Sequence, residues 1–208
     1  MKVKLQKNIK RFVDIVLSAT ILITFLPAWV IIAILIKATS EGPVFFLQER
    51  PGQNKDIFKV HKFRTMRPGS EKMVKGQEVM KGDARVTKIG NFLRRTKIDE
   101  LPQIINVLKG EMSLIGPRPE RIESLEDYTH ETEKRLNMKP GMTGLAQVSG
   151  NIHLPLEDRY KYDVYYVENY SLWLDAKILM RTVGVVILGE EKYVGKQIVK
   201  AEEEKKVS

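Results

Sequence analysis

Two adjacent carboxylates, Asp99 and Glu100, are the residues of this 208-residue chain whose spacing most suggests chemistry. Arg94 and Lys97 precede them and Arg118 follows them, so cationic side chains flank the acidic pair. A helix N-terminus surrounded by Arg and Lys binds phosphate groups. An ionised carboxylate there could attack phosphorus as a nucleophile or hold a divalent cation. The alternative is that Asp99 only caps free N–H groups at a helix start.

The acidic pair opens a short predicted helix that ends at Lys109. Its apolar residues recur at the helical spacing i, i+3, i+4 and i+7: Leu101, Ile104, Ile105 and Leu108. Pro102 is tolerated only in a first helical turn, which places Asp99 at or near the N-cap. At about 100° per residue, Gln103 and Asn106 share with Asp99 the face opposite the apolar residues.

A stiff turn is predicted at Pro117, Arg118 and Pro119, because two prolines fix the backbone on either side of one arginine. A rigidly held guanidinium suits a diphosphate, which it can bind through two parallel hydrogen bonds. The alternative is that the prolines only mark the start of a charged, solvent-exposed helix running to about Asn137.

Two strand-like runs, 44–49 and 57–63, are separated by a loop rich in turn residues, which predicts a β-hairpin. Lys62 and Arg64 lie at the end of its second strand. They are candidates for binding phosphate, although charged residues on an edge strand are often only solvated.

A long apolar run extends from Ile15 to Ile36. Its about 22 residues would measure roughly 33 Å as a helix, enough to span a bilayer. Both flanks are basic, however, and Pro27 interrupts the run. A spanning helix would send one positive end outward against the usual bias, whereas a kinked helix that enters and leaves by the same face would not. A simple transmembrane anchor and a re-entrant hairpin are therefore both open on the residues alone.

The formal net charge of +9 implies an anionic partner. Five basic residues precede the apolar run, namely Lys2, Lys4, Lys7, Lys10 and Arg11. No nucleic-acid-binding motif is recognised, so membrane lipid and phosphorylated substrates are the expected partners. The chain has no cysteine, and its three histidines lack zinc-site spacing, so a metal here would be a hard cation with oxygen ligands.

Three other segments carry weaker signals. Residues 66–82 predict a mobile loop that could cover the site. Aromatic residues between Leu156 and Leu188 predict a helical core, with Tyr170 and Trp173 as alternative lipid-interface residues. Residues 190–208 are rich in Lys and Glu, and we expect them to be disordered.

Four blocks of sequence, taken together, resemble the bacterial sugar transferases, also called monotopic phosphoglycosyl transferases. They are Lys62-Phe63-Arg64-Thr65-Met66 and the segments 83–90, 92–103 and 112–119. The resemblance runs from about residue 8 to about residue 188, and it is to the small form that consists of the catalytic core. It implies an α+β, mostly helical fold: residues 1–40 form a basic N-terminus and a re-entrant membrane helix, and residues 41–189 form a compact cytosolic domain.

The resemblance further implies transfer of a sugar 1-phosphate from a UDP-sugar to a polyprenyl phosphate such as undecaprenyl phosphate, with release of UMP. Such a reaction initiates glycoconjugate or polysaccharide assembly at the cytoplasmic face of the bacterial inner membrane. Asp99 would attack the β-phosphorus and form a covalent aspartyl-phosphosugar. Mg²⁺ would be held by Asp99 and Glu100.

Six residues are expected to contact the substrate: Lys62, Arg64, Arg94, Pro117, Arg118 and Pro119. The rival hypothesis is a non-enzymatic, membrane-anchored adaptor whose basic face binds anionic lipid and a partner enzyme. That adaptor explains the charge and the apolar run equally well, but it leaves the Asp-Glu pair between two arginine-bearing turns without a role.

Overall fold

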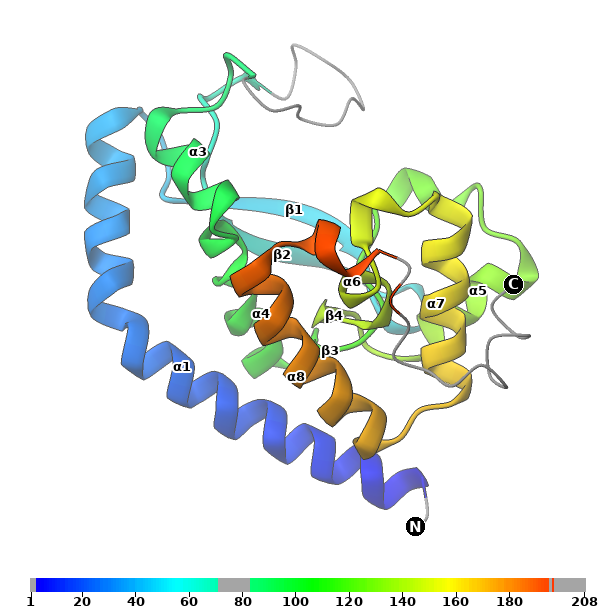
Figure 1. Cartoon of the computed structure of the whole chain (residues 1–208). Coiled ribbons are helices and arrows are strands. Elements are labelled where there is room, and N and C mark those ends of the chain that lie inside the picture. Colours follow the sequence, from blue (N-terminus) through cyan, green and yellow to red (C-terminus); the bar gives the residue numbers. More distant parts are fainter. Residues whose placement is uncertain (1–2, 71–82, 195, 197–208) are drawn as a thin grey trace.

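The computed structural model describes residues 3–70, 83–194 and 196, and it shows a mostly helical α+β protein with two small sheets (Figure 1). The fold class predicted from the sequence is confirmed. The longer elements are α1 (Val3–Thr39), β1 (Phe45–Pro51), β2 (Ile57–Phe63), α3 (Lys88–Arg95), α4 (Gln103–Lys109), α7 (Leu156–Glu168) and α8 (Leu172–Leu188). The predicted loop 66–82 lies outside the described residues from residue 71 onward.

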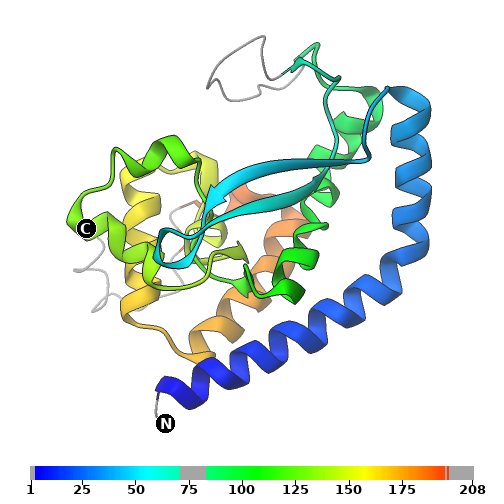
Figure 2. The same cartoon turned by 180° about the vertical axis from the view of Figure 1, so that it is seen from behind.

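Helix α1 is bent about halfway along its length and curves around one side of the remaining, globular part of the chain (Figures 1 and 2). Pro27 lies inside the helix. It donates no backbone hydrogen bond, and its ring clashes with the carbonyl of the preceding turn, which is a recognised cause of helix bending. Within the described residues, α1 is the one helix long and apolar enough to cross a membrane.

Charged residues near the start of α1 bind the globular part. Lys10 forms an ion pair with Asp175 of α8 at 2.8 Å. Arg11 donates hydrogen bonds to the carbonyls of Val107 and Leu108, which satisfy the free C-terminal end of α4. Lys10 and Arg11, two of the five basic residues expected to face an anionic partner, are therefore engaged within the protein.

The far end of α1 is also tied to the globular part. The Arg64 guanidinium donates to the carbonyl and to the hydroxyl of Ser40, at 2.8 and 3.0 Å. Trp29 and Ile36 of α1 are buried against Phe63 and Leu93. Both ends of α1 therefore contact the same compact body. If a membrane covered the outer side of the helix between them, both ends would lie on the same side of that membrane.

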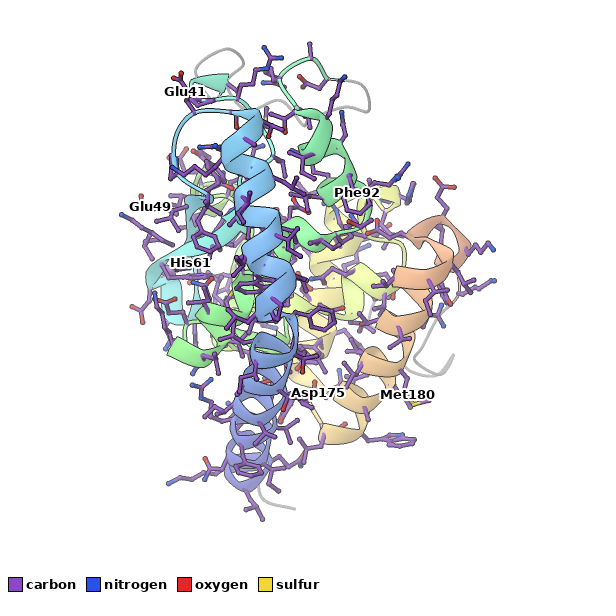
Figure 3. All side chains as sticks on the ribbon, turned by 90° about the vertical axis from the view of Figure 1, so that its left-hand side faces the viewer. Glu41, Glu49, His61, Phe92, Asp175 and Met180 are labelled. Carbon is purple, nitrogen blue, oxygen red and sulfur yellow. The ribbon has the colours of Figure 1, made fainter. Side chains whose placement is uncertain are left out.

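The outer side of α1, which faces the viewer in Figure 3, is apolar and exposed. Its exposed residues beyond the bend include Ile23, Phe25, Leu26, Val30, Ile31 and Ile34. A contiguous apolar surface of this kind on a helix is typical of contact with lipid or with another protein.

Strands β1 and β2 form the predicted hairpin. They pair antiparallel, with Phe45 opposite Phe63 and Pro51 opposite Ile57. Helix α4 lies against the hairpin through Asn106, which accepts a hydrogen bond from the backbone N–H of His61 and donates one to the carbonyl of Lys59. Asn106, which the sequence places on the face opposite the apolar residues of the helix, is thus buried where it pairs with the β2 backbone.

Two parallel strands, β3 (Ser113–Ile115) and β4 (Gly141–Thr143), form the second sheet. A core of aliphatic and tyrosine side chains from β3, α6 (Leu145–Val148), α7 and α8 covers it. Tyr165 and Tyr166 are buried there as predicted, whereas Trp173 at the start of α8 is 69% exposed.

The predicted helix from Glu120 to Asn137 is wrong. The segment contains three short elements instead: η3 (Ile122–Leu125), α5 (His130–Glu133) and η4 (Lys134–Asn137). Thr129 caps α5, and the chain then turns so that Arg135 enters the protein interior. Glu190–Tyr193, expected to be disordered, form the short helix η6, and residues 197–208 lie outside the described residues.

Candidate active site

The acidic pair lies in a short 3-10 helix, η2 (Ile98–Glu100), one turn before α4. Pro102, and not Asp99, is the N-cap residue of α4. Lys97 begins the turn with a left-handed backbone (φ 58°), which reverses the chain after α3 and brings the end of α3 beside the acidic pair. The expectation that Asp99 caps α4 is therefore corrected by one helical turn.

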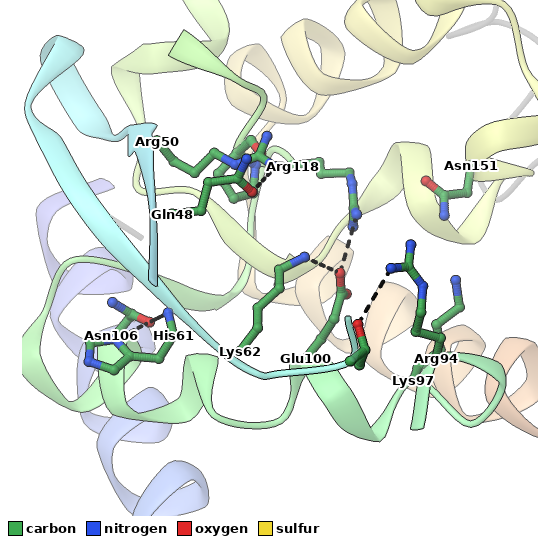
Figure 4. Close-up of polar contacts among 12 residues, drawn as sticks. Gln48, Arg50, His61, Lys62, Arg94, Lys97, Glu100, Asn106, Arg118 and Asn151 are labelled. Atoms are coloured by element: carbon green, nitrogen blue, oxygen red, sulfur yellow. Dashed lines mark hydrogen bonds and ion pairs between the residues drawn. The ribbon is translucent and has the colours of Figure 1, made fainter. Parts of the chain in front are cut away.

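Two cations converge on one oxygen of Glu100. Lys62 Nζ of β2 lies 2.7 Å from Glu100 Oε1, and Arg118 Nη2 lies 3.3 Å from the same atom (Figure 4). Their charges outweigh the cost of burial and hold the pKa of Glu100 well below its usual range. The structure thus brings together three residues that the sequence analysis selected from separate motifs.

Asp99 behaves in the opposite way. Burial and, to a smaller extent, the negative charge of Glu100 raise its pKa to about 6, although the charges of Lys62, Arg94 and Lys97 act against the rise. Among the residues that the structure describes, no hydrogen bond or ion pair engages its carboxylate. A carboxylate that is shielded from water and held by no cation is available to react.

Arg94 lies in the last turn of α3 and makes a long contact of 3.5 Å with Thr65 Oγ1. Its positive charge lowers the pKa of Asp99, so it belongs to the neighbourhood of the acidic pair. Figure 4 shows Arg94 and Lys97 side by side, on the opposite side of Glu100 from Lys62.

Arg64 does not join this cluster. It is buried, and it holds the C-terminal end of α1 through Ser40. Only Nη2 of the guanidinium contacts Ser40, whereas Nε and Nη1 are buried without a hydrogen-bond partner among the described residues. A role of Arg64 in binding substrate phosphate therefore stays a prediction.

The turn that presents Arg118 is held by its three carbonyls. The backbone N–H of Gly141 donates to Pro117 O at 2.8 Å. Arg135 donates to Arg118 O at 2.7 Å, and Arg50 donates to Pro119 O at 3.3 Å. Prolines offer no N–H, so carbonyl acceptors are the main way to fix such a turn.

Arg50 and Arg135 were not identified from the sequence. Arg50 stands at the end of β1 in a loop read only as a turn, and burial together with the neighbouring Arg118 lowers its pKa to about 10. Arg135 pairs with Asp163 in the core, donates to Tyr128 at 2.5 Å, and stacks on Tyr160. No local spacing marks the Arg135 contacts, because Tyr128, Tyr160 and Asp163 lie outside the element that carries Arg135.

The acidic pair offers two oxygen-bearing side chains for a hard cation. Within the described part of the chain, no group of three or more His, Cys, Asp or Glu side chains could hold a metal ion. A Mg²⁺ site here would therefore need substrate oxygens and water to complete its coordination. Asp99 is free to contribute, whereas Glu100 Oε1 already faces Lys62 and Arg118.

Comparison with known proteins gives matches over most of the chain. The chain is 41% identical over 194 residues to the UDP-glucose:undecaprenyl-phosphate glucose-1-phosphate transferase of Klebsiella pneumoniae, covering 88% of this chain and 41% of that protein. It is 44% identical over 159 residues to the galactosyl transferase CpsE of Streptococcus agalactiae, covering 71% and 35%. The chain thus spans less than half the length of these relatives.

A relative of similar size is the uncharacterized sugar transferase EpsL of Bacillus subtilis. The two are 45% identical over 149 residues, which is 72% of each chain. A family model described as bacterial sugar transferase matches residues 5–189, which include all but the first two residues of α1, the acidic pair and the Arg118 turn. The chain therefore belongs to the bacterial sugar transferase family.

Proposed function

We propose that this protein transfers a sugar 1-phosphate from a UDP-sugar to undecaprenyl phosphate and releases UMP. Several relatives about 40% identical to it carry names that state this kind of reaction. The observation that carries the proposal is the difference within the acidic pair: Glu100 is held by two cations, while the Asp99 carboxylate is unengaged among the described residues.

In the first step, a carboxylate oxygen of Asp99 attacks the β-phosphorus of the UDP-sugar. An O–P bond forms to Asp99, the bond from the β-phosphorus to the bridging oxygen breaks, and UMP leaves with the electron pair. In the second step, a phosphate oxygen of undecaprenyl phosphate attacks the same phosphorus, and Asp99 leaves as a carboxylate. The products are UMP and the undecaprenyl diphosphate sugar.

The cations around the acidic pair have separate tasks in this reaction. Arg118 and Lys62 face the point where negative charge would gather on the diphosphate, and they stabilise it electrostatically. Arg94 approaches from the opposite side, beside Asp99. Pro117 and Pro119 fix the Arg118 backbone, so we assign them a positioning role and no direct contact with the substrate.

We propose Mg²⁺ as the cofactor, with Asp99 and Glu100 as its protein ligands. When bound, it would offset the charge of the diphosphate. Lys62 and Arg118 both contact Oε1 of Glu100, which leaves its second carboxylate oxygen for a metal, and these two cations would keep Glu100 ionised and oriented.

The placement at the membrane is part of the proposal. A helix attached to the globular part at both ends, with an apolar outer side between them, suits a re-entrant segment that enters and leaves one leaflet. The globular part would then lie on the cytoplasmic face of the cell membrane. In this position the active site would meet the phosphate of a lipid acceptor at the height of the headgroups.

The test is product analysis. Membranes that carry the protein, given a panel of UDP-sugars, undecaprenyl phosphate and Mg²⁺, are expected to release UMP. Asp99→Asn should abolish the release, and Asp127→Asn, a control at an exposed aspartate, should leave it unchanged. Release of UDP would contradict the covalent mechanism, because it indicates ordinary glycosyl transfer. No nucleotide release from any UDP-sugar would favour the adaptor hypothesis.

A further inference from the structure

Three polar side chains in the segment 147–151 are buried and lack a full set of partners. Gln147 is 8% exposed, Ser149 2% and Asn151 4%. Within the described residues, both amide atoms of Gln147, the hydroxyl of Ser149 and Oδ1 of Asn151 have no hydrogen-bond partner. Buried polar groups are nearly always satisfied in folded proteins, by the protein, by ordered water or by a ligand.

These groups lie on one short segment, and its last member, Asn151, borders the site. Asn151 reaches from η5 (Asn151–His153) toward Arg118, Arg94 and Lys97 (Figure 4). Its Nδ2 donates to Glu190 Oε1 at 3.1 Å. The same Glu190 oxygen lies 3.1 Å from Lys97 Nζ, and Lys97 acts electrostatically on both members of the acidic pair.

Gln147 is connected to the Arg118 turn through two glycines. A Cβ placed on Gly144 would lie 2.1 Å from the Gly116 carbonyl and 2.7 Å from Gln147 Oε1. The absence of side chains at Gly116 and Gly144 thus lets helix α6, which carries Gln147, begin directly beside the loop that leads to Arg118.

The segment that carries Glu190 is held firmly. After α8, Gly189 (φ 89°) turns the chain into η6, and the ring of Tyr193 packs onto Gly184 and under the Arg181 guanidinium. Val194 then packs beside Gly150, the residue before Asn151. The packing of Tyr193 and Val194 therefore fixes Glu190 next to Asn151, independently of its ion pair with Lys97.

These four residues form a surface that we call the polar wall: Gln147, Ser149, Asn151 and Glu190. Its unpartnered atoms are the Gln147 amide nitrogen and three oxygens, namely Gln147 Oε1, Ser149 Oγ and Asn151 Oδ1, and the Glu190 carboxylate adds further acceptors. A carboxylate repels a diphosphate, and it is also a poor match for the two carbonyl oxygens of uracil. A sugar offers several O–H donors on adjacent carbons, and acceptor-rich side chains suit such a ligand.

We propose that the polar wall binds hydroxyl groups of the sugar that is transferred and distinguishes one sugar from another. This inference rests on the proposed function. It places the sugar on the Lys97 side of the acidic pair, across from the hairpin. Asn151 and Glu190 are the residues assigned to recognise hydroxyl positions, and Gln147 and Ser149 supply the further hydrogen-bonding groups behind them.

The experiment measures UMP release from pairs of UDP-sugars that differ only at one hydroxyl, such as UDP-glucose and UDP-galactose. Asn151→Gly removes the amide while tolerating the left-handed backbone (φ 49°). We expect the KM of the preferred UDP-sugar to rise about tenfold and the preference between the epimers to fall about fivefold, because a site built to bind a hydroxyl discriminates strongly. Inhibition by UDP, which carries no sugar, should stay within about twofold of wild type.

Glu190→Gln keeps the shape of the side chain and removes its charge, so it repeats the test without a backbone change. Glu191→Gln makes the same chemical change at the exposed neighbour on η6 and should behave as wild type. Unchanged KM and epimer preference in both wall variants would overturn the inference, as would a parallel loss of UDP inhibition. A wild-type protein that releases no UMP would instead refute the proposed function.

Discussion

Asp99 and Glu100 are neighbours in sequence but occupy different electrostatic environments. Glu100 accepts from Lys62 and Arg118, which keeps its pKa low, whereas burial and the charge of Glu100 raise the pKa of Asp99 to about 6. Two titratable groups whose pKa values are driven apart have different roles in a mechanism. Glu100 is suited to stay ionised and hold charge, and Asp99 is suited to attack.

The raised pKa of Asp99 predicts an acid limb in the pH profile. The proposed nucleophile is the ionised carboxylate, which is half of the population at a pH equal to the pKa of about 6, predominates above it and is lost as the pH falls through it. We expect the rate of UMP release in a single turnover to fall about tenfold per pH unit below the pKa. Omitting undecaprenyl phosphate from this assay removes the titration of the lipid phosphate.

A charge variant checks that Asp99 is the group that titrates. Lys97 lowers the pKa of Asp99, so Lys97→Asn should move the acid limb to higher pH, and asparagine tolerates the left-handed backbone at this position. Lys109→Asn removes a charge from an exposed site on α4 and should leave the limb in place. A limb that stays at the same pH in Lys97→Asn would assign it to another group.

At the scale of elements, the Arg118 turn depends on two other arginines. The buried guanidinium of Arg135 is the central one, since it contacts the Arg118 carbonyl, Tyr128 and the Asp163 carboxylate at once. Both members of the Arg135–Asp163 pair have side chains that are 1% exposed. Removing one partner from such a pair leaves an uncompensated buried charge, while removing both does not.

Comparing the single and the double variant separates an effect on folding stability from an effect on catalysis. Arg135→Met should lower the free energy of unfolding by about 3–5 kcal/mol, and the double variant Arg135→Met with Asp163→Leu should recover much of that loss. UMP release should stay low in the double variant, because the Arg118 carbonyl still lacks its donor. Urea unfolding in detergent and the UMP assay provide the two measurements.

The matched control is Lys134→Gln, next to Arg135 but on the surface, where its ion pairs with Glu131 and Glu168 are partly exposed. It should change stability by less than about 1 kcal/mol. Full recovery of UMP release in the double variant would mean that the Arg135 contact does not position Arg118.

The structure also shows which features could be predicted from local sequence. The β-hairpin and the acidic pair follow from strand runs, turn residues and helix-start signals within about ten positions. The helix predicted to run to Asn137 is wrong, because the chain turns there and Arg135 pairs with Asp163 of α7. The contact between Arg64 and Ser40 was not predicted either. Contacts between elements distant in sequence leave no periodic signal, and the polar wall depends on such contacts.

At the scale of the whole molecule, α1 holds the globular part at a fixed orientation. Lys10, Arg11 and Asp14 bind it at one end, and Ser40 binds it at the other. The apolar outer side lies between these attachments. If lipid covers that side, the membrane surface must pass close to both ends of α1. The bend in α1 then sets how far the active site lies from the membrane.

The absence of cysteine from the chain permits a direct test of this arrangement. Single substitutions Leu5→Cys and Glu41→Cys place a thiol at an exposed position near each end of α1, and Ile31→Cys places one on its outer side. With a membrane-impermeant maleimide, we expect both end thiols to react in inverted membrane vesicles and neither in intact spheroplasts. Ile31→Cys should stay unreactive in both, because lipid covers it.

Lys109→Cys, exposed on α4, reports the side on which the globular part lies. If one end thiol reacted from the outside while Lys109→Cys did not, α1 would span the membrane, and its contacts at both ends with one globular body could not persist.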